Sequence, residues 1–244
     1  MRDRSDPIPT AVQTSLEGLG ITVPAPMLDR LAGYLDLLLE ANRQFNLTSV
    51  RDPAEAWQRH IVDSLTLLPF LEDLPEGARI IDVGTGGGLP GIPLAITRPD
   101  LRVTLLESTG KKSAFCDRCR ETLPLENARI VNDRAEEAGR RDDHRQQYDA
   151  AVCRALGPMR VLLEYTMPLI RVGGMLLAMK GPKAEAELEV SGDALDALGA
   201  GALQVVDAYP PQFGQSTVVV VVAKDRATPS RYPRRAGEPK RAPL

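Results

Sequence analysis

A glycine-rich segment between a predicted strand and a predicted helix constrains the fold of this chain more than any other feature. The run from Asp82 to Gly88 reads DVGTGGG, ends an apolar stretch and precedes a segment with Pro90 near its start, where helices favour proline. Glycine lets the chain turn tightly and brings bare backbone against a ligand. Doubly wound α/β sheets bind nucleotides at this place, the carboxyl end of a strand. A tight turn alone needs one or two glycines, so four in five residues predict a binding loop.

The chain around this loop has the pattern of an α/β fold. From Ala78 onward, short apolar runs alternate with segments of helical length, which predicts a mostly parallel sheet with right-handed crossovers. The expected strands are 79–83, 102–106, 128–131, 150–153 and 175–179, and the expected helices are 90–97, 111–123, 159–170 and 184–198. Two further β-rich runs, 203–208 and 217–223, leave no room for a crossover helix between them. We therefore expect a seven-stranded sheet that closes with an antiparallel hairpin.

Three segments are expected along the chain. Residues 1–75 should form an N-terminal helical extension, because leucines at 28, 31, 35, 38 and 39 repeat at helical spacing. Residues 76–224 should form the nucleotide-binding core, and residues 225–244 a basic, proline-rich tail. Prolines at 229, 233, 239 and 243 should prevent a regular helix or central strand in the tail.

Composition excludes several classes of protein. The chain is 43% hydrophobic and 26% charged, as in ordinary globular proteins. The longest aliphatic run, Val218 to Ala223, is far below the roughly 18 residues that span a bilayer, and the N-terminus leads into no apolar signal segment. Three cysteines do not make the disulfide framework of a secreted protein. We expect a monomeric, cytoplasmic protein without a membrane partner.

The sequence predicts no metal site. Cys116 and Cys119 form a C-x-x-C inside a predicted helix, and Cys153 is the only other thiol. A second pair of ligands, as a structural zinc site requires, is absent from the pattern, and His60 and His144 are the only histidines. His60 is expected to cap or pack a helix.

The glycine loop leaves the kind of nucleotide open. The dinucleotide fingerprint needs a small residue where this chain has Leu89. Glu107 lies at the end of the second predicted strand, 25 positions after Asp82, where a carboxylate accepts hydrogen bonds from ribose hydroxyls. This suits either a dinucleotide or S-adenosylmethionine. The spacing Asp-x-Gly-x-Gly-x-Gly resembles the first motif of Rossmann-like methyltransferases that use S-adenosylmethionine.

Further motifs make the resemblance specific. In chain order they are NRQFNLT at 42–48, HIVDS at 60–64, DVGTGGGLPG at 82–91, Leu106-Glu107-Ser108 with Lys111, Lys112 and Phe115, Arg154-Ala155, and a tail with Tyr232-Pro233-Arg234-Arg235, Gly237 and Pro239-Lys240. Together they resemble the bacterial ribosomal small-subunit methyltransferase G family, also called glucose-inhibited division protein B, over nearly the whole chain. The resemblance implies transfer of a methyl group from S-adenosylmethionine to N7 of a guanine in 16S ribosomal RNA, in a loop near the decoding site. The partner would be 16S ribosomal RNA or the small subunit.

The resemblance also implies cofactor contacts. They are Gly84, Leu89, the backbone of Ala135 and Glu136, and Arg154. Ala135 and Glu136 follow the third predicted strand and Arg154 the fourth, so all should lie on one rim of the sheet. With the loop residues, the expected cofactor-binding set is Asp82, Gly84, Gly86, Gly88, Leu89, Glu107, Ala135, Glu136 and Arg154.

No catalytic residue is expected. Guanine N7 carries a lone pair, so its methylation removes no proton and needs no general base or cysteine nucleophile. Catalysis should come from holding that lone pair in line with the methyl–sulfur bond. Asp82 is expected to anchor the loop backbone, and a direct role for Asp82 or Glu136 in stabilising the cationic product is the alternative.

Basic residues suggest how RNA is held. The net charge is −3, but residues 224–244 carry +5 and the remainder −8, an asymmetry typical of proteins with a polyanionic partner. In the tail, Tyr232 also offers a stacking surface among the arginines. The alternatives are a solvated, disordered tail and solvated lysines at 111 and 112. The expected RNA contacts are Arg43, Asn46, Lys111, Lys112, Arg234, Arg235 and Lys240.

Three alternatives compete with a 16S ribosomal RNA methyltransferase. One is a methyltransferase of another RNA or of a small molecule on the same fold. A second is a nucleotide-dependent dehydrogenase, which Leu89 and the basic tail disfavour. The third is a non-enzymatic RNA-binding protein with a relic cofactor site, which an intact glycine loop with Glu107 argues against.

Overall fold

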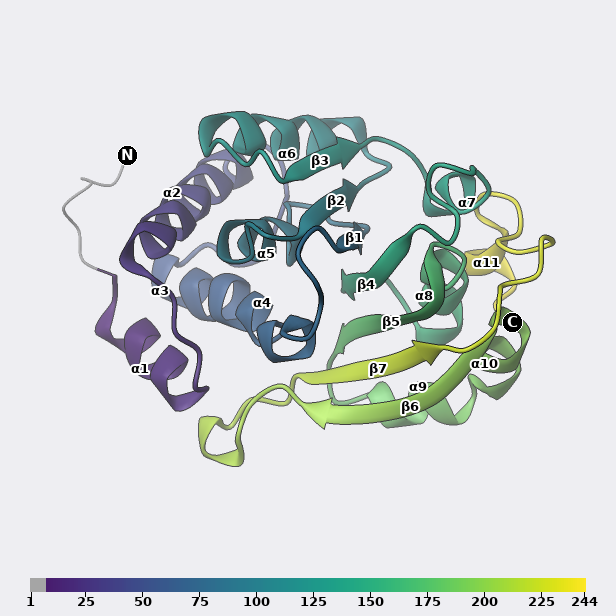
Figure 1. The fold of residues 1–244 in the computed structure, drawn as a ribbon. Helices are drawn as coiled ribbons and strands as arrows, with labels where there is room; N and C mark the ends of the chain where they lie inside the picture. Colours follow the sequence, from purple (N-terminus) through teal and green to yellow (C-terminus); the bar gives the residue numbers. More distant parts are fainter. Residues whose placement is uncertain (1–7) are drawn as a thin grey trace.

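The computed structural model describes residues 8–244, and a seven-stranded sheet lies at its centre (Figure 1). The spatial order of the strands is β3-β2-β1-β4-β5-β7-β6. Strands β1 to β5 pair in parallel, and β7 runs antiparallel between β5 and β6. The predicted fold, a mostly parallel sheet that closes with an antiparallel hairpin, is therefore confirmed. The strands are β1 (Arg79–Val83), β2 (Arg102–Leu106), β3 (Ala128–Val131), β4 (Tyr148–Arg154), β5 (Ile170–Lys180), β6 (Ala200–Asp207) and β7 (Val218–Lys224).

The strand order reverses beside β1. The chain passes from β1 to β2 and β3 on one side and then crosses back to β4 on the other. The carboxyl ends of β1 and β4 therefore meet at a topological switch point, which is where open α/β sheets bind ligands. The glycine-rich loop follows β1 and Arg154 ends β4, so the topology brings both to this point.

Within residues 8–244, helices connect successive strands of the core. They are α5 (Gly91–Thr97), α6 (Gly110–Thr122), α8 (Met159–Thr166), α9 (Ala184–Glu189) and α10 (Gly192–Leu198), and the four-residue helix α7 (Ala135–Ala138) follows β3. Two predicted helices were too long. Helix α8 ends before Pro168, and β5 already begins at Ile170. The segment 184–198 is divided near Ser191 and Gly192, both poor residues for a helix interior.

The tail also contains a helix, contrary to the prediction that its prolines exclude one. Helix α11 (Glu238–Arg241) is a single turn with Pro239 in its first positions. A proline is tolerated there, because the backbone N–H groups of a first turn have no partner within the helix. The prediction considered only the helix interior and was therefore wrong for residues 238–241.

The N-terminal helices pack against the core and support the glycine loop. Tyr34 is buried and its hydroxyl donates to the carbonyl of Gly87 at 2.6 Å. Leu31 and Leu38 are fully buried in the same apolar cluster as Ile92 of α5, each contributing about 1.5–3 kcal/mol by burial. The boundaries 1–75, 76–224 and 225–244 stay predictions, and residues 1–7 lie outside the described residues. The N-terminal elements are α1 (Thr10–Gly18), α2 (Ala25–Asn42), α3 (Pro53–Ala56), a π-helical segment (Trp57–Val62), α4 (Asp63–Leu65) and a 3-10 turn (Leu68–Leu71).

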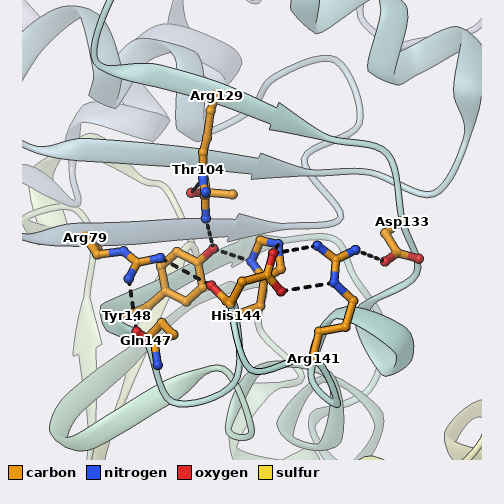
Figure 2. A network of polar contacts seen from close by, with 9 residues as sticks. Arg79, Thr104, Arg129, Asp133, Arg141, His144, Gln147 and Tyr148 are labelled. Atoms are coloured by element: carbon orange, nitrogen blue, oxygen red, sulfur yellow. Dashed lines mark hydrogen bonds and ion pairs between the residues drawn. The ribbon is translucent and has the colours of Figure 1, made fainter.

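A polar network extends across the sheet from β3 over β2 and β1 to β4 (Figure 2). The guanidinium of Arg129 donates to the hydroxyl of Tyr148 at 2.9 Å and to Thr104 Oγ1 at 2.9 Å. The same Tyr148 hydroxyl lies 2.6 Å from Nδ1 of His144, which is 1% exposed. Between β3 and β4 lie the short α7 and an irregular segment that carries His144, and the hydrogen bond between His144 and Tyr148 ties this segment to the sheet. No helix among residues 8–244 has the length and apolar character needed to cross a membrane.

Candidate active site

Gly86 and Gly88 of the loop have different structural roles. Gly86 has φ +60°, and a Cβ added there would meet no atom nearer than the Gly84 carbonyl at 3.9 Å, so this side of the loop faces open space. A Cβ on Gly88 would lie 2.3 Å from Cδ1 of Ile92. Gly86 therefore leaves room for a ligand, whereas Gly88 lets α5 pack closely against the loop.

Asp82 anchors the glycine-rich loop through buried hydrogen bonds. Its side chain is fully buried, and Oδ2 accepts hydrogen bonds from Thr85 Oγ1 at 2.5 Å and the Gly91 amide at 2.8 Å. Within residues 8–244, Oδ1 has no hydrogen-bond partner. Burial raises the pKa of this carboxyl to about 6, although the bonds from Thr85 and Gly91 oppose the shift. A buried carboxylate with one unpaired oxygen would gain from a cationic group beside it.

Glu107 joins the glycine loop to helix α6. One carboxylate oxygen accepts from the Gly86 amide at 3.0 Å and the other from the Thr109 amide at 2.7 Å. The side chain is 7% exposed. Sequence reasoning gave Glu107 only a ribose contact, and the structure adds that it holds the loop in place.

The cysteines pack in the core. Cys116 and Cys119 are fully buried on α6, and Cys116 Sγ lies 3.5 Å from the Gly86 carbonyl. Burial raises the pKa of both thiols, that of Cys119 to about 12. Both thiols therefore stay protonated at neutral pH and act as small apolar residues.

Helix α7 brings Ala135 and Glu136 to the same rim at the end of β3. In the part of the chain that the structure describes, the backbone amides of both residues donate to no protein acceptor. The Glu136 side chain is 3% exposed and accepts from the Gly237 amide at 2.7 Å. The first two amides of α7 can thus donate to a ligand, whereas the Glu136 carboxylate accepts from the tail.

A cleft of about 450 Å³ opens beside the glycine loop. It has a basic character, because Arg59, Lys112 and Arg154 contribute to its walls. Leu89 lines it too and is 6% exposed. The other lining residues are the segment 47–50, His60, Asp63, Gly84, Thr85, Gly86, Gly87 and Ala155.

One wall of the cleft is a hydrogen-bonded cluster around His60. Arg154 donates to the Arg59 carbonyl at 2.7 Å and lies 3.4 Å from Nδ1 of His60, whose Nε2 is 2.8 Å from Thr48 Oγ1. Since a guanidinium only donates, Nδ1 is assigned as an acceptor and the proton to Nε2. His60 lies in the π-helical segment, a feature frequent at functional sites. The prediction that His60 only caps or packs a helix was therefore incomplete.

His60 should stay neutral over the physiological pH range. Burial, and then the charge of Arg154, lowers its pKa to about 4. The unfolded chain protonates this imidazole near pH 6.5, so His60 lowers the free energy of unfolding as pH falls from about 6.5 toward 4. Proton NMR should show no titration of the His60 ring between pH 8 and 5, with a His60→Asn variant identifying its signal. A midpoint near 6.5 would contradict the assigned geometry.

The predicted RNA contacts are only partly gathered. Lys112 reaches the cleft and Lys111 is exposed beside it on α6, whereas Arg43 and Asn46 line an adjoining hollow with Arg51. The Asn42 side chain holds the segment 42–48, which joins this hollow to the cleft wall. Its Oδ1 accepts hydrogen bonds from the backbone amides of residues 47 and 48 at 2.8 and 2.9 Å. Of the predicted RNA contacts, Lys112 therefore lines the cleft itself, and Arg43 and Asn46 lie in the segment that immediately precedes the cleft wall in sequence.

The tail, whose Arg234, Arg235 and Lys240 are expected to contact RNA, is an ordered segment packed on the core. It lies beside α7 and α8, on the opposite side of the molecule from α1 and α2 (Figure 1). The Arg234 guanidinium is bound by Glu164, with Nη2 2.6 Å from Oε2. Lys224, counted in the tail's charge, is 1% exposed and donates to the carbonyls of Met167 and Leu198. Arg235 and Lys240 are exposed.

Sequence reasoning missed four residues at or behind the cleft wall, namely Thr48, Arg59, Asp63 and Tyr209. Thr48 bonds to His60, and Asp63 accepts from the Tyr209 hydroxyl at 2.6 Å and lies 3.8 Å from Arg154. Thr48, His60 and Asp63 stand in motifs that carried the resemblance, so position in those motifs was the available signal. Tyr209 comes from the β6–β7 connection, and nothing in its local sequence indicates the site.

Comparisons with known proteins agree with this geometry. The family model described as rRNA small subunit methyltransferase G matches residues 27–212. The chain is 40% identical over 225 residues to "Ribosomal RNA small subunit methyltransferase G" of Moorella thermoacetica, covering 92% of this chain and 93% of that one. The protein of the same name from Sorangium cellulosum is 41% identical over 227 residues, covering 93% and 92%.

Solved structures show the same fold at low identity. A 16S rRNA adenine-N1 methyltransferase from Catenulisporales acidiphilia aligns with TM-score 0.50 and 15% identity, over 62% of this chain and 87% of that one. The fibrillarin pre-rRNA processing protein of Methanococcus jannaschii aligns with TM-score 0.50 and 14% identity, over 62% and 69%. Because the family model spans most of the chain and the relatives match nearly all of it, this protein belongs to the rRNA small subunit methyltransferase G family.

Proposed function

We propose that this protein transfers a methyl group from S-adenosylmethionine to N7 of a guanine in 16S ribosomal RNA, in a loop near the decoding site. The observation that carries the proposal is the cleft, which joins the open side of the glycine loop to a wall containing Arg59, Lys112 and Arg154. A cofactor site thereby opens directly onto a surface suited to RNA phosphates. Membership of the family supports the same activity.

The residues at the sheet rim fit S-adenosylmethionine. The cofactor carries positive charge on its sulfonium and amino groups, and the unpaired Oδ1 of Asp82 marks a buried carboxylate that such charge would stabilise. Gly86 leaves open space, Glu107 has lone pairs for ribose hydroxyls, and the amides of Ala135 and Glu136 are unpaired donors. Gly84, Leu89 and Arg154 complete the proposed set at the cleft. When bound, the cofactor supplies an electrophilic methyl group.

The protein's part in the chemistry is positioning. His60 is neutral and both of its ring nitrogens are engaged within the wall. Asp82 is bonded to the loop that it anchors, and the Glu136 carboxylate faces the tail. None of these groups is needed to remove a proton, because guanine N7 attacks through its own lone pair. The cleft holds the base beside the glycine loop, and the surrounding cations hold the RNA backbone.

Methyl transfer in vitro tests the proposal. Purified protein with labelled S-adenosylmethionine should place one methyl group on 16S ribosomal RNA or the small subunit, and mapping should locate it at a guanine N7. The single-turnover rate should show no titration of an essential base while protein and RNA stay folded. Label on another atom, or a rate that requires a titrating group, would contradict the proposed chemistry. The monomeric state and the cytoplasmic location stay predictions.

A further inference from the structure

We propose that the C-terminal strap, defined as residues 228–241, is a positioning element of the cofactor site that holds helix α7 in place. The inference rests on the proposed function, because it takes the backbone of Ala135 and Glu136 as cofactor contacts. Arg234, which the sequence predicts as an RNA contact, has its guanidinium paired with Glu164 in this strap. The strap lies against α7 and α8 in Figure 1.

The strap contacts α7 at two places, the side chain of Glu136 and the C-terminal end of the helix. Glu136, nearly fully buried, accepts from the backbone amide of Gly237 at 2.7 Å. Gly139 follows α7, and a Cβ there would lie 3.0 Å from the ring of Pro233, so strap and helix are in close contact. Arg145 links the end of α7 to the strap, because it donates to the carbonyls of both Gly139 and Tyr232, each at 2.8 Å.

A buried ion pair fixes the strap to the core. Glu164 of α8 has a side chain with 0% exposure, and it accepts from Arg234 through Nη2 at 2.6 Å, Nε at 2.9 Å and the backbone amide at 2.7 Å. Removing one partner of such a pair leaves an uncompensated buried charge. Arg234 is therefore an anchor of the strap whose removal also leaves the buried Glu164 without its partner.

Helix α7 needs such support because it is only four residues long. Helices of this length are not stable by themselves, so neighbouring contacts determine where the backbone lies. The amides of Ala135 and Glu136 are unpaired within the described residues, and their usefulness to a ligand depends on fixed positions. A loosened α7 would have to be ordered on binding, which lowers affinity for the cofactor.

The chain offers a matched control for this role. Arg235 is adjacent to Arg234 and carries the same charge, but its side chain is exposed and forms no hydrogen bond within residues 8–244. An RNA arm would use both arginines through their charge. A strap uses Arg234 alone, because only Arg234 reaches Glu164.

Calorimetric titration of the full-length variants with S-adenosylmethionine, without RNA, tests the inference. Arg234→Ala should weaken binding about tenfold or more, whereas Arg235→Ala should bind as the wild type does. In steady-state assays Arg234→Ala should raise KM for S-adenosylmethionine and leave kcat at saturating cofactor and KM for RNA within twofold. Arg234→Lys, which keeps the charge but loses the forked geometry, should fall between the two.

A folded Arg234→Ala protein with wild-type cofactor affinity would overturn the inference, as would equal losses of RNA affinity in both variants with cofactor binding unchanged. If Arg234→Ala does not fold, hydrogen exchange on the wild type decides. Adding S-adenosylmethionine should slow exchange in residues 134–139 and in the strap together, and protection confined to the glycine loop and α6 would overturn it. A wild-type protein that binds no S-adenosylmethionine overturns the proposed function and the inference with it.

Discussion

Gly86→Val should lower the affinity for S-adenosylmethionine about a hundredfold or more, which corresponds to about 2.7 kcal/mol. The space in front of Gly86 is open, with no atom nearer than 3.9 Å to an added Cβ, and the valine side chain would occupy it. Valine is also strained at φ +60°. Calorimetric titration with S-adenosylmethionine gives the affinity, and methylation should fall in parallel.

Gly20→Val is the matched control for backbone strain. Gly20 has φ +68° with nothing within 4 Å of an added Cβ, and it lies between α1 and α2, away from the loop. This variant should lose stability as Gly86→Val does but bind the cofactor normally. Wild-type affinity in a folded Gly86→Val protein would place the cofactor elsewhere.

Glu107→Ala should weaken S-adenosylmethionine binding by roughly tenfold to a hundredfold, since hydrogen bonds to a charged acceptor contribute about 1.5–3 kcal/mol. The substitution removes the proposed ribose contact and releases the amides of Gly86 and Thr109. The free loop then has to be ordered when the ligand binds. Isothermal titration reports the loss directly.

Two further variants separate the hydrogen bonds of Glu107 from a general effect of removing a negative charge on α6. Glu121→Ala removes a carboxylate that is 67% exposed on the same helix α6, and it should leave cofactor affinity unchanged. Glu107→Gln keeps an oxygen acceptor for one amide and should lose less than Glu107→Ala. Unchanged affinity in a folded Glu107→Ala protein would mean that the ribose is held by other groups.

The fold could be predicted closely because its signals are local. Apolar runs with helical segments between them specified the parallel strands, and the short connection between 203–208 and 217–223 specified the hairpin. Errors occurred where local rules compete. Helix α8 ends just before Pro168, the segment 184–198 breaks between Glu189 and Gly192, and Pro239 is accepted in a first turn, whereas hydrophobic periodicity alone would have continued the first two helices.

The site was predictable only where chain position determines it. The glycine loop, Glu107 and Arg154 follow strands that share one rim, so topology alone brings them together. The partners of these residues depend on packing between distant segments. Nothing near Tyr209 indicates that it bonds to Asp63, and nothing near Arg234 indicates a buried acid 70 residues earlier.

The tail illustrates how charge counting fails. A net charge describes a segment but not whether its cations are free. Lys224 is buried among carbonyls and Arg234 is paired, so part of the tail's positive charge serves the protein's own structure. Exposed cations at Arg235 and Lys240 remain for a contact with RNA.

Nucleoside analysis of 16S ribosomal RNA tests the central claim most directly. RNA from cells that lack this protein should lose 7-methylguanosine at one position, and the wild-type gene should restore it whereas Gly86→Val should not. Mass spectrometry of digested RNA measures the modification, and fragment mapping locates it near the decoding site. An unchanged 7-methylguanosine content in cells without the protein would contradict the account.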